Sequence, residues 1–163
     1  MEKKIKVFIV EDDILYQKNL AKKLEGLDLD TKCFSSGEDC IHELLETPEI
    51  IILDFNLNSQ ENKSFNGLKV LQEVKRIAPN TYVIMLSAND SLDIAVESIK
   101  EGCYDYITKN ETAFVRLDAK ITAIKHLIEI KQALAKSKFA SKLRVGIIVA
   151  FLFAYFIIKL FFK

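Results

Sequence analysis

The chain has 163 residues, of which half are apolar and 28% are charged, with only five Gly and two Pro. This composition excludes disordered, collagen-like and low-complexity proteins and predicts one ordinary domain with a packed core. The net charge is zero, but residues 1–110 carry 13 basic and 20 acidic side chains whereas residues 111–163 carry 10 basic and 3 acidic, which excludes a uniformly basic nucleic-acid-binding protein.

From the N-terminus to about residue 110, short apolar runs alternate with stretches of helical periodicity. The apolar runs predict strands at 5–10, 29–33, 50–53, 83–86 and 104–108. The stretches between them predict helices at 14–27, 36–45, 66–77 and 91–100. Five strands that alternate with helices predict the α/β class, with a doubly wound parallel sheet covered by helices on both faces.

Functional groups in parallel α/β sheets lie at the carboxyl ends of the strands. Polar side chains follow four of the five predicted strands: Glu11, Asp12 and Asp13, then Asp54, Ser87 and Lys109. Each of them alone fits an ordinary helix cap or turn residue. Their convergence favours phosphoryl transfer, because clustered carboxylates suit Mg²⁺, one carboxylate can act as a nucleophile, and a hydroxyl and an ammonium can bind phosphoryl oxygens.

Four stretches of the sequence together resemble a response-regulator receiver domain, the phosphoacceptor module of two-component signalling. They are KVFIVEDD, IIILDFNL, VIMLSA and GCYDYITK, and the resemblance extends over about residues 4–125. It implies a five-stranded parallel sheet of the flavodoxin-like type. It also implies a sensor histidine kinase or a phosphotransfer protein as the partner that donates the phosphoryl group.

The resemblance further implies a metal site and a phosphoacceptor. Glu11 and Asp12 correspond to the acidic pair that binds Mg²⁺, and Asp13 is an acidic neighbour whose role is left open. Asp54 corresponds to the phosphoacceptor, which is also a metal ligand, and Asn56 to the residue whose backbone carbonyl binds the metal.

Three further positions correspond to the phosphate-binding and switch residues of the family. Ser87 matches the hydroxyl that follows the phosphoryl group, Lys109 matches the lysine that pairs with the phosphate, and Tyr106 matches the aromatic switch residue. The implied activity serves regulation. We therefore expect that the protein is not an enzyme. At most it would phosphorylate itself slowly from small phosphodonors and dephosphorylate itself slowly.

The sequence departs from the family's pattern in two loops. Asn58 stands where the family usually has Pro, and residues 59–65 make this loop several residues longer than usual, with an effect that the sequence leaves open. Asn110 follows Lys109, where the family normally has Pro in a cis peptide. A cis bond before a residue other than Pro costs about 2.5–4 kcal/mol, so either this bond is trans and Lys109 shifts, or the strain is retained.

The C-terminal segment of the chain is strongly apolar. Residues 145–158 carry no charge, and the run continues past Lys159 to Phe162. As a helix it would be about 27 Å long at roughly 1.5 Å per residue, close to the ~30 Å hydrocarbon core of a bilayer. This pattern predicts a transmembrane helix over residues 144–163, with a buried C-terminal helix of a soluble protein as the alternative.

The flanking charges predict the orientation of this helix. Between residues 125 and 144 stand five Lys and one Arg against the single acid Glu129. Because positive flanks stay in the cytoplasm, we expect a single-pass C-terminal anchor in the bacterial inner membrane, with the receiver domain cytoplasmic and the lipid bilayer as a partner. The expected domains are a receiver domain over 1–128, a basic juxtamembrane helix or linker over 129–143, and the span.

A single long helix is expected after residue 111, because residues 111–145 contain neither Gly nor Pro. Its apolar stripe at three- and four-residue spacing would pack on the sheet and consists of Phe114, Leu117, Ile121, Ile124 and Ile128. Gly146 and Ala150 form a pair of small residues that leaves a homodimer through the span open.

Three functional classes are consistent with the sequence. The favoured one is a membrane-anchored phosphoacceptor that signals by conformational change or phosphotransfer, with no nucleic acid as partner. The second is a pseudo-receiver that acts as a membrane-tethered interaction module whatever its phosphorylation state. The third is an aspartyl-nucleophile phosphatase, which is disfavoured because Asn56 stands where that family needs a second acid. The cognate kinase, input signal, output partner and organism are not encoded in these patterns.

Overall fold

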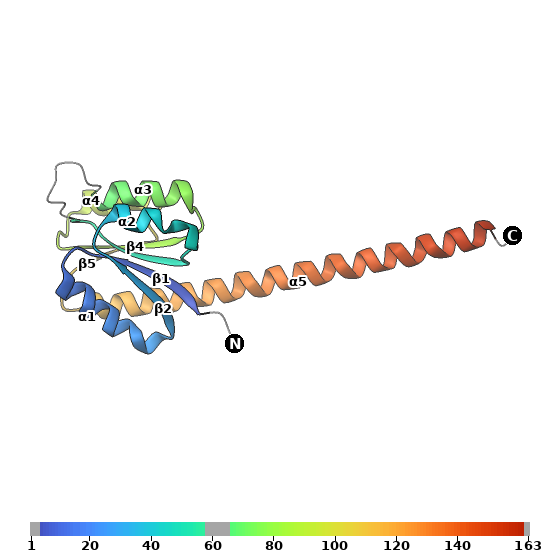
Figure 1. Ribbon diagram of the computed structural model, residues 1–163, viewed down its shortest axis with the longest axis horizontal. Helices are drawn as coiled ribbons and strands as arrows, with labels where there is room; N and C mark the ends of the chain where they lie inside the picture. The colour runs from blue at the N-terminus through green and yellow to red at the C-terminus, as the bar shows by residue number, and fades with distance from the viewer. Residues whose placement is uncertain (1–3, 58–65, 162–163) are drawn as a thin grey trace. The chain divides into compact units, whose positions relative to one another are not determined.

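Five parallel strands form one sheet with the order β2-β1-β3-β4-β5 in a computed structural model that describes residues 4–57 and 66–161 (Figure 1). This topology confirms the predicted five-stranded parallel α/β fold. The strands are β1 (Ile5–Val10), β2 (Leu29–Phe34), β3 (Ile50–Asp54), β4 (Tyr82–Ser87) and β5 (Asp105–Thr108).

Helices cover both faces of the sheet, as the alternating pattern predicts. The helices are α1 (Ile14–Leu24), α2 (Gly37–His42), α3 (Gly67–Ile77), α4 (Leu92–Lys100) and α5 (Ala113–Phe161). Figure 1 shows α2, α3 and α4 on one face of the sheet and α1 with the start of α5 on the other. The chain divides into two units, residues 1–123 and 124–163, so α5 begins in the first unit and continues into the second.

The strands are held by their apolar side chains. All five residues of β3 are buried, and its neighbours β1 and β4 are buried over most of their length. Between the sheet and the helices α2 and α3, Phe8, Leu53, Val70 and Met85 belong to one apolar core. Strands buried on both faces need such continuous apolar runs, which is why the sequence pattern located them within one or two residues.

Two predicted helices are shorter than expected. The helix predicted over 14–27 ends at Leu24 and continues as a 3₁₀ turn, Glu25–Leu27, before Asp28 adopts a left-handed conformation. The helix predicted over 36–45 ends at His42, and a second 3₁₀ turn, Leu44–Glu46, follows before Thr47 adopts a left-handed conformation. A residue that precedes Pro is disfavoured in the right-handed helical region, which accounts for the end of this second turn at Glu46, since Thr47 precedes Pro48.

Strand register brings the carboxyl ends of the central strands to one edge of the sheet. Val10 pairs with Leu53, and Asp54 pairs with Leu86 in the next strand. Ser87 pairs in turn with Thr108. The residues that follow these positions therefore lie side by side, although they are far apart in the sequence.

The second unit is described only in part. It continues α5 as one helix to Phe161, but the side chains of 152–156 and 160–161 and the whole of 162–163 lie outside the description. Within the part that is described, no helix has both the length and the apolar character required for a membrane span. The span predicted over 144–163 therefore has no support from the described residues.

A buried amide joins the ends of β1 and β2. Gln17 is buried, and its Nε2 donates hydrogen bonds of 2.8 Å to the carbonyl oxygens of Glu11 and Phe34. The backbone N–H of Glu11 also donates to the carbonyl of Phe34, at 3.0 Å. Gln17 thus fixes the backbone at the point where β1 delivers its acidic residues.

We predict that Gln17→Leu lowers the free energy of unfolding by about 1–3 kcal/mol, because two buried carbonyls lose a donor. Thermal denaturation followed by circular dichroism measures this as a decrease in Tm of several degrees. Asn19→Leu, at an exposed position of the same helix, should change stability by less than about 0.5 kcal/mol. Equal effects of the two substitutions would contradict the assigned role of the Gln17 amide.

Candidate functional site

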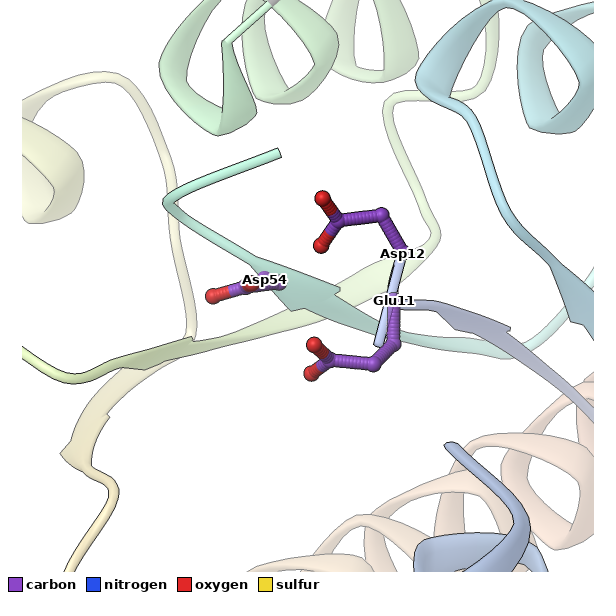
Figure 2. A group of neighbouring side chains, drawn as sticks. All are labelled: Glu11, Asp12 and Asp54. Atoms are coloured by element: carbon purple, nitrogen blue, oxygen red, sulfur yellow. The ribbon is translucent and has the colours of Figure 1, made fainter. Parts of the chain in front are cut away.

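Three carboxylates meet at the carboxyl edge of the sheet. Glu11 and Asp12 follow β1, Asp54 ends β3, and one oxygen from each lies within 4.8 Å of the other two. Figure 2 shows their carboxylates pointing to the same side of the two strands. Glu11 and Asp54 are buried, whereas Asp12 is partly exposed. The structure therefore brings together the three acidic side chains that the sequence singled out as metal ligands.

A lysine that directly follows β5, the outermost strand of the sheet, reaches this cluster. The Nζ atom of Lys109 lies 2.7 Å from Oε2 of Glu11 and 3.0 Å from Oδ2 of Asp54. Its backbone N–H donates to the carbonyl of Ser87 at 2.7 Å, which continues the pairing of β4 with β5. The two buried carboxylates are therefore held by one ammonium group.

Burial and mutual charge shift the ionisation of this group of residues. Burial raises the pKa of the Glu11 carboxyl to about 7, opposed by its hydrogen bond from Lys109 and reinforced by the charge of Asp54. Burial lowers the pKa of Lys109, but its pairing with Glu11 and Asp54 raises it more, so the net direction is upward. Lys109 thus stays protonated at neutral pH. The three carboxylates still outnumber this one ammonium group, so the cluster attracts a further cation.

The cleft above these residues has the composition of a magnesium site. Its volume is about 490 Å³, and the described residues that line it are Glu11, Asp12, Asp13, Tyr16, Asp54, Asn56, Ala88 and Lys109. Four of these are acidic and one is basic. Carboxylate and carbonyl oxygens without sulfur or imidazole ligands fit Mg²⁺, which prefers oxygen and keeps several waters.

Two predicted neighbours of the metal site have identified hydrogen bonds. Asp13 is the N-cap of α1, where its Oδ1 accepts from the N–H groups of Leu15 and Tyr16 at 2.9 and 3.0 Å. The N–H of Asn56 donates to Oδ1 of Asp54 at 3.2 Å. This bond orients the Asp54 carboxylate, and the role of the Asn56 carbonyl as a metal ligand stays a prediction.

The predicted switch residues Ser87 and Tyr106 share a partner that sequence reasoning missed. Oγ of Ser87, which is buried, accepts from the N–H of Asn89 at 3.0 Å. The hydroxyl of Tyr106 donates to the carbonyl of the same Asn89 at 2.8 Å. Asn89 therefore links the hydroxyl at the end of β4 to the aromatic ring on β5. No sequence pattern marks it, because the link uses only its backbone.

The peptide bond after Lys109 is trans, since the described residues contain no cis peptide bond. Oδ1 of Asn110 accepts hydrogen bonds from the N–H and the hydroxyl of Thr112, at 3.0 and 2.8 Å. Asn110 thus forms the turn that leads into α5, and Lys109 still reaches both carboxylates. A strained cis bond between Lys109 and Asn110, the other outcome that the sequence left open, is therefore excluded. Asn58 and the predicted insertion at 59–65 lie outside the described residues.

Comparison with known proteins identifies the family. The model of the response regulator receiver domain matches residues 7–122, and the chain belongs to this family. The DNA-binding transcriptional regulator NtrC of Klebsiella pneumoniae is 30% identical over 103 residues, which are 63% of this chain and 21% of the relative. The regulatory protein LuxO of Vibrio cholerae is 29% identical over 102 residues, 62% of this chain and 21% of its own length. The chain thus spans about a fifth of these curated relatives.

Solved structures show the same fold. The receiver domain of a putative LuxO repressor from Vibrio parahaemolyticus has a TM-score of 0.72 at 23% identity, over 81% of this chain and 98% of that domain. The BeF3-activated DrrB receiver domain has a TM-score of 0.67 at 25% identity, over 76% and 99%. These structures confirm the flavodoxin-like receiver fold, and the family model above assigns the chain to the response-regulator receiver domains.

Gly67 permits a close contact between α3 and the acceptor strand. Its N–H donates to the carbonyl of Phe55 at 3.1 Å. A Cβ atom at this position would collide with the carbonyl oxygen of Asp54 and lie 2.6 Å from Cα of Phe55. These are backbone atoms of the segment that carries Asp54, so they cannot move aside without shifting its carboxylate.

We predict that Gly67→Ala destabilises the protein by about 1–3 kcal/mol, the typical cost of overpacking. The same substitution should slow any reaction that depends on the position of the Asp54 carboxylate. Urea unfolding measures the stability change. Gly26→Ala is the matched control, because a Cβ there meets nothing within 4 Å. A Gly67→Ala variant as stable as Gly26→Ala would contradict the close contact.

Proposed function

We propose that Asp54 accepts a phosphoryl group from the phosphohistidine of a sensor histidine kinase or phosphotransfer protein. The observation that carries the proposal is the convergence of Glu11, Asp12 and Lys109 on the Asp54 carboxylate at the open edge of the sheet. Membership in the receiver family supports it, because that family implies a histidine kinase or another phosphodonor as partner.

In this reaction an oxygen of Asp54 bonds to phosphorus as the bond from phosphorus to the donor's imidazole nitrogen breaks. The bonding electron pair leaves with the imidazole, and the product is an acyl phosphate on Asp54. Lys109, whose ammonium lies 3.0 Å from Oδ2 of Asp54, is placed to bind a phosphoryl oxygen as negative charge develops. Asn56 holds the other carboxylate oxygen through its N–H.

Mg²⁺ would be held by Glu11, Asp12 and Asp54, with the carbonyl of Asn56, and when bound supplies positive charge that offsets the carboxylates and the phosphoryl oxygens. The net acidic character of the residues lining the cleft supports this assignment. We propose that the chemistry is regulatory, with slow self-phosphorylation and self-dephosphorylation in place of enzymatic turnover.

The consequence of phosphorylation would begin at Ser87. Its hydroxyl can leave the N–H of Asn89 and bind a phosphoryl oxygen instead. The loop that contains Asn89 would then be free to move, and the carbonyl of Asn89 is the group that accepts the hydrogen bond from the Tyr106 hydroxyl. The change would then reach the partner that receives the signal. The alternative function is a pseudo-receiver that acts as a membrane-tethered interaction module without phosphorylation. The departures from the family's pattern at Asn110 and in the 59–65 loop suggest it, whereas the contacts of Lys109 with Glu11 and Asp54 oppose it.

We also propose that the chain is anchored in the bacterial inner membrane by its C-terminal segment, with the receiver domain in the cytoplasm. The uncharged run over 145–158 and the basic residues that precede it support this proposal. The part of α5 that is described does not itself meet the criteria for a span. A direct test is therefore required.

For the phosphoacceptor, we predict that the full chain in mild detergent gains one phosphoryl group from acetyl phosphate when Mg²⁺ is present. Intact-mass spectrometry measures the gain. It should disappear with Asp54→Asn and on removal of the metal with EDTA, and persist with Asp93→Asn, which changes an exposed Asp on α4. Folded protein that binds Mg²⁺ and gains no phosphoryl group would favour the pseudo-receiver.

For the anchor, we predict that the chain expressed in bacteria stays in the membrane fraction after a carbonate wash. Phe151→Asp should release a large share of it, since an Asp inside a span costs about 2.5–3.5 kcal/mol. Val115→Asp is the matched control, because Val115 and Phe151 are both 73% exposed but Val115 lies in the first unit. Extraction of the unmodified chain by carbonate would contradict the anchor.

A further inference from the structure

The ring of Tyr16 forms a wall of the phosphoacceptor cleft. Tyr16 lies in the first turn of α1, lines the cleft and is half-buried. The Nζ atom of Lys109 lies over its ring, 4.5 Å from the ring centroid. A cation at this distance from an aromatic face is attracted by the π-electrons of the ring. Lys109 thus has two carboxylates and an aromatic face as neighbours.

A second aromatic ring holds Tyr16 in this position. Phe114, in the first turn of α5, stacks on Tyr16 with a centroid distance of 5.8 Å and an angle of 25° between the ring planes. The Nζ atom of Lys23, from the last turn of α1, lies 5.9 Å from the centroid of Phe114. The rings therefore connect Lys109 to α1 and to the start of α5, all within the first unit.

This contact gives Lys109 a restraint that its backbone does not provide. The lysine is followed by Asn110 through a trans bond, and its side chain must span from β5 to the ends of β1 and β3. A lysine has four flexible side-chain torsions, so ion pairs alone leave its ammonium several geometries. A ring packed against the ammonium reduces that freedom and keeps the group facing Asp54.

We propose that Tyr16 is a positioning residue that holds the Lys109 ammonium against Asp54, and that Phe114 holds Tyr16 in turn. The effect on phosphorylation rests on the proposed function of Asp54, but the contact itself does not. The aromatic ring carries the effect, and the Tyr16 hydroxyl does not take part. Tyr16→Phe should therefore behave nearly as the unmodified protein does, whereas Tyr16→Leu should not.

The first experiment measures the contact without any phosphorylation. In the full chain labelled with ¹³C-lysine, the Hε protons of Lys109 should be shifted upfield by the ring current of Tyr16, with Lys109→Arg used to assign the signal. The shift should persist in Tyr16→Phe and be lost in Tyr16→Leu. Tyr104→Leu, which removes a ring that contacts Tyr82 elsewhere on the sheet, should leave it unchanged. Loss of the shift in Tyr104→Leu, or its persistence in Tyr16→Leu, would overturn the proposal.

The second experiment measures the consequence for phosphorylation. We expect Tyr16→Leu to lower the rate of Asp54 phosphorylation by acetyl phosphate by about 2- to 30-fold, the range that loss of a cation–π interaction corresponds to. Phe114→Leu should act in the same direction with a smaller effect, and Tyr16→Phe should restore most of the rate.

A double-mutant cycle then distinguishes positioning from a general loss of structure. If Tyr16 acts through Lys109, adding Tyr16→Leu to Lys109→Met should produce little further decrease. An equal decrease on both backgrounds would overturn the proposal. If the unmodified chain accepts no phosphoryl group, the proposed function of Asp54 fails, and the ring-current measurement alone decides whether Tyr16 holds Lys109.

Discussion

The pairing of one lysine with two buried carboxylates is the interaction on which this site depends. Lys109 directly follows β5, the last strand of the sheet, whereas Glu11 follows β1 and Asp54 ends β3, so the contact can form only when the parallel sheet is complete. Buried carboxylates at this spacing repel each other, and the ammonium compensates for part of that repulsion. The same arrangement leaves an acidic cleft that fits a divalent cation and an ammonium that fits a phosphoryl group.

The sheet and most of the acidic cluster could be predicted from the sequence because both depend on local pattern. Buried parallel strands need continuous apolar runs, and their carboxyl ends must share one edge, so the residues that follow them come together. Glu11, Asp12 and Asp54 were located by this argument, and the structure places them within reach of one another. The predicted helix starts at residues 36 and 66 are confirmed as well, because Ser36 and Asn66 cap α2 and α3.

The remaining features depend on contacts between elements that no local pattern encodes. Tyr16 fits an ordinary apolar position of a helix, and its place beneath Lys109 follows only from its contacts with Lys109, which follows β5, and with Phe114 in α5. Asn89 acts through its backbone, and Gln17 through an amide that could equally face solvent. The trans geometry after Lys109 was one of two outcomes that the sequence left open. The apolar C-terminal pattern predicted a membrane span that the described residues do not support.

The central claim is that the Asp54 carboxylate is the phosphoacceptor, and chemical trapping tests it most directly. Borohydride reduces an aspartyl phosphate to homoserine, so treatment of the phosphorylated full chain followed by peptide mass spectrometry identifies the modified position. The account predicts homoserine at residue 54, formed only when Mg²⁺ was present during phosphorylation. Homoserine at Asp12 or Asp13, or phosphate retained on a residue that borohydride does not reduce, would contradict it.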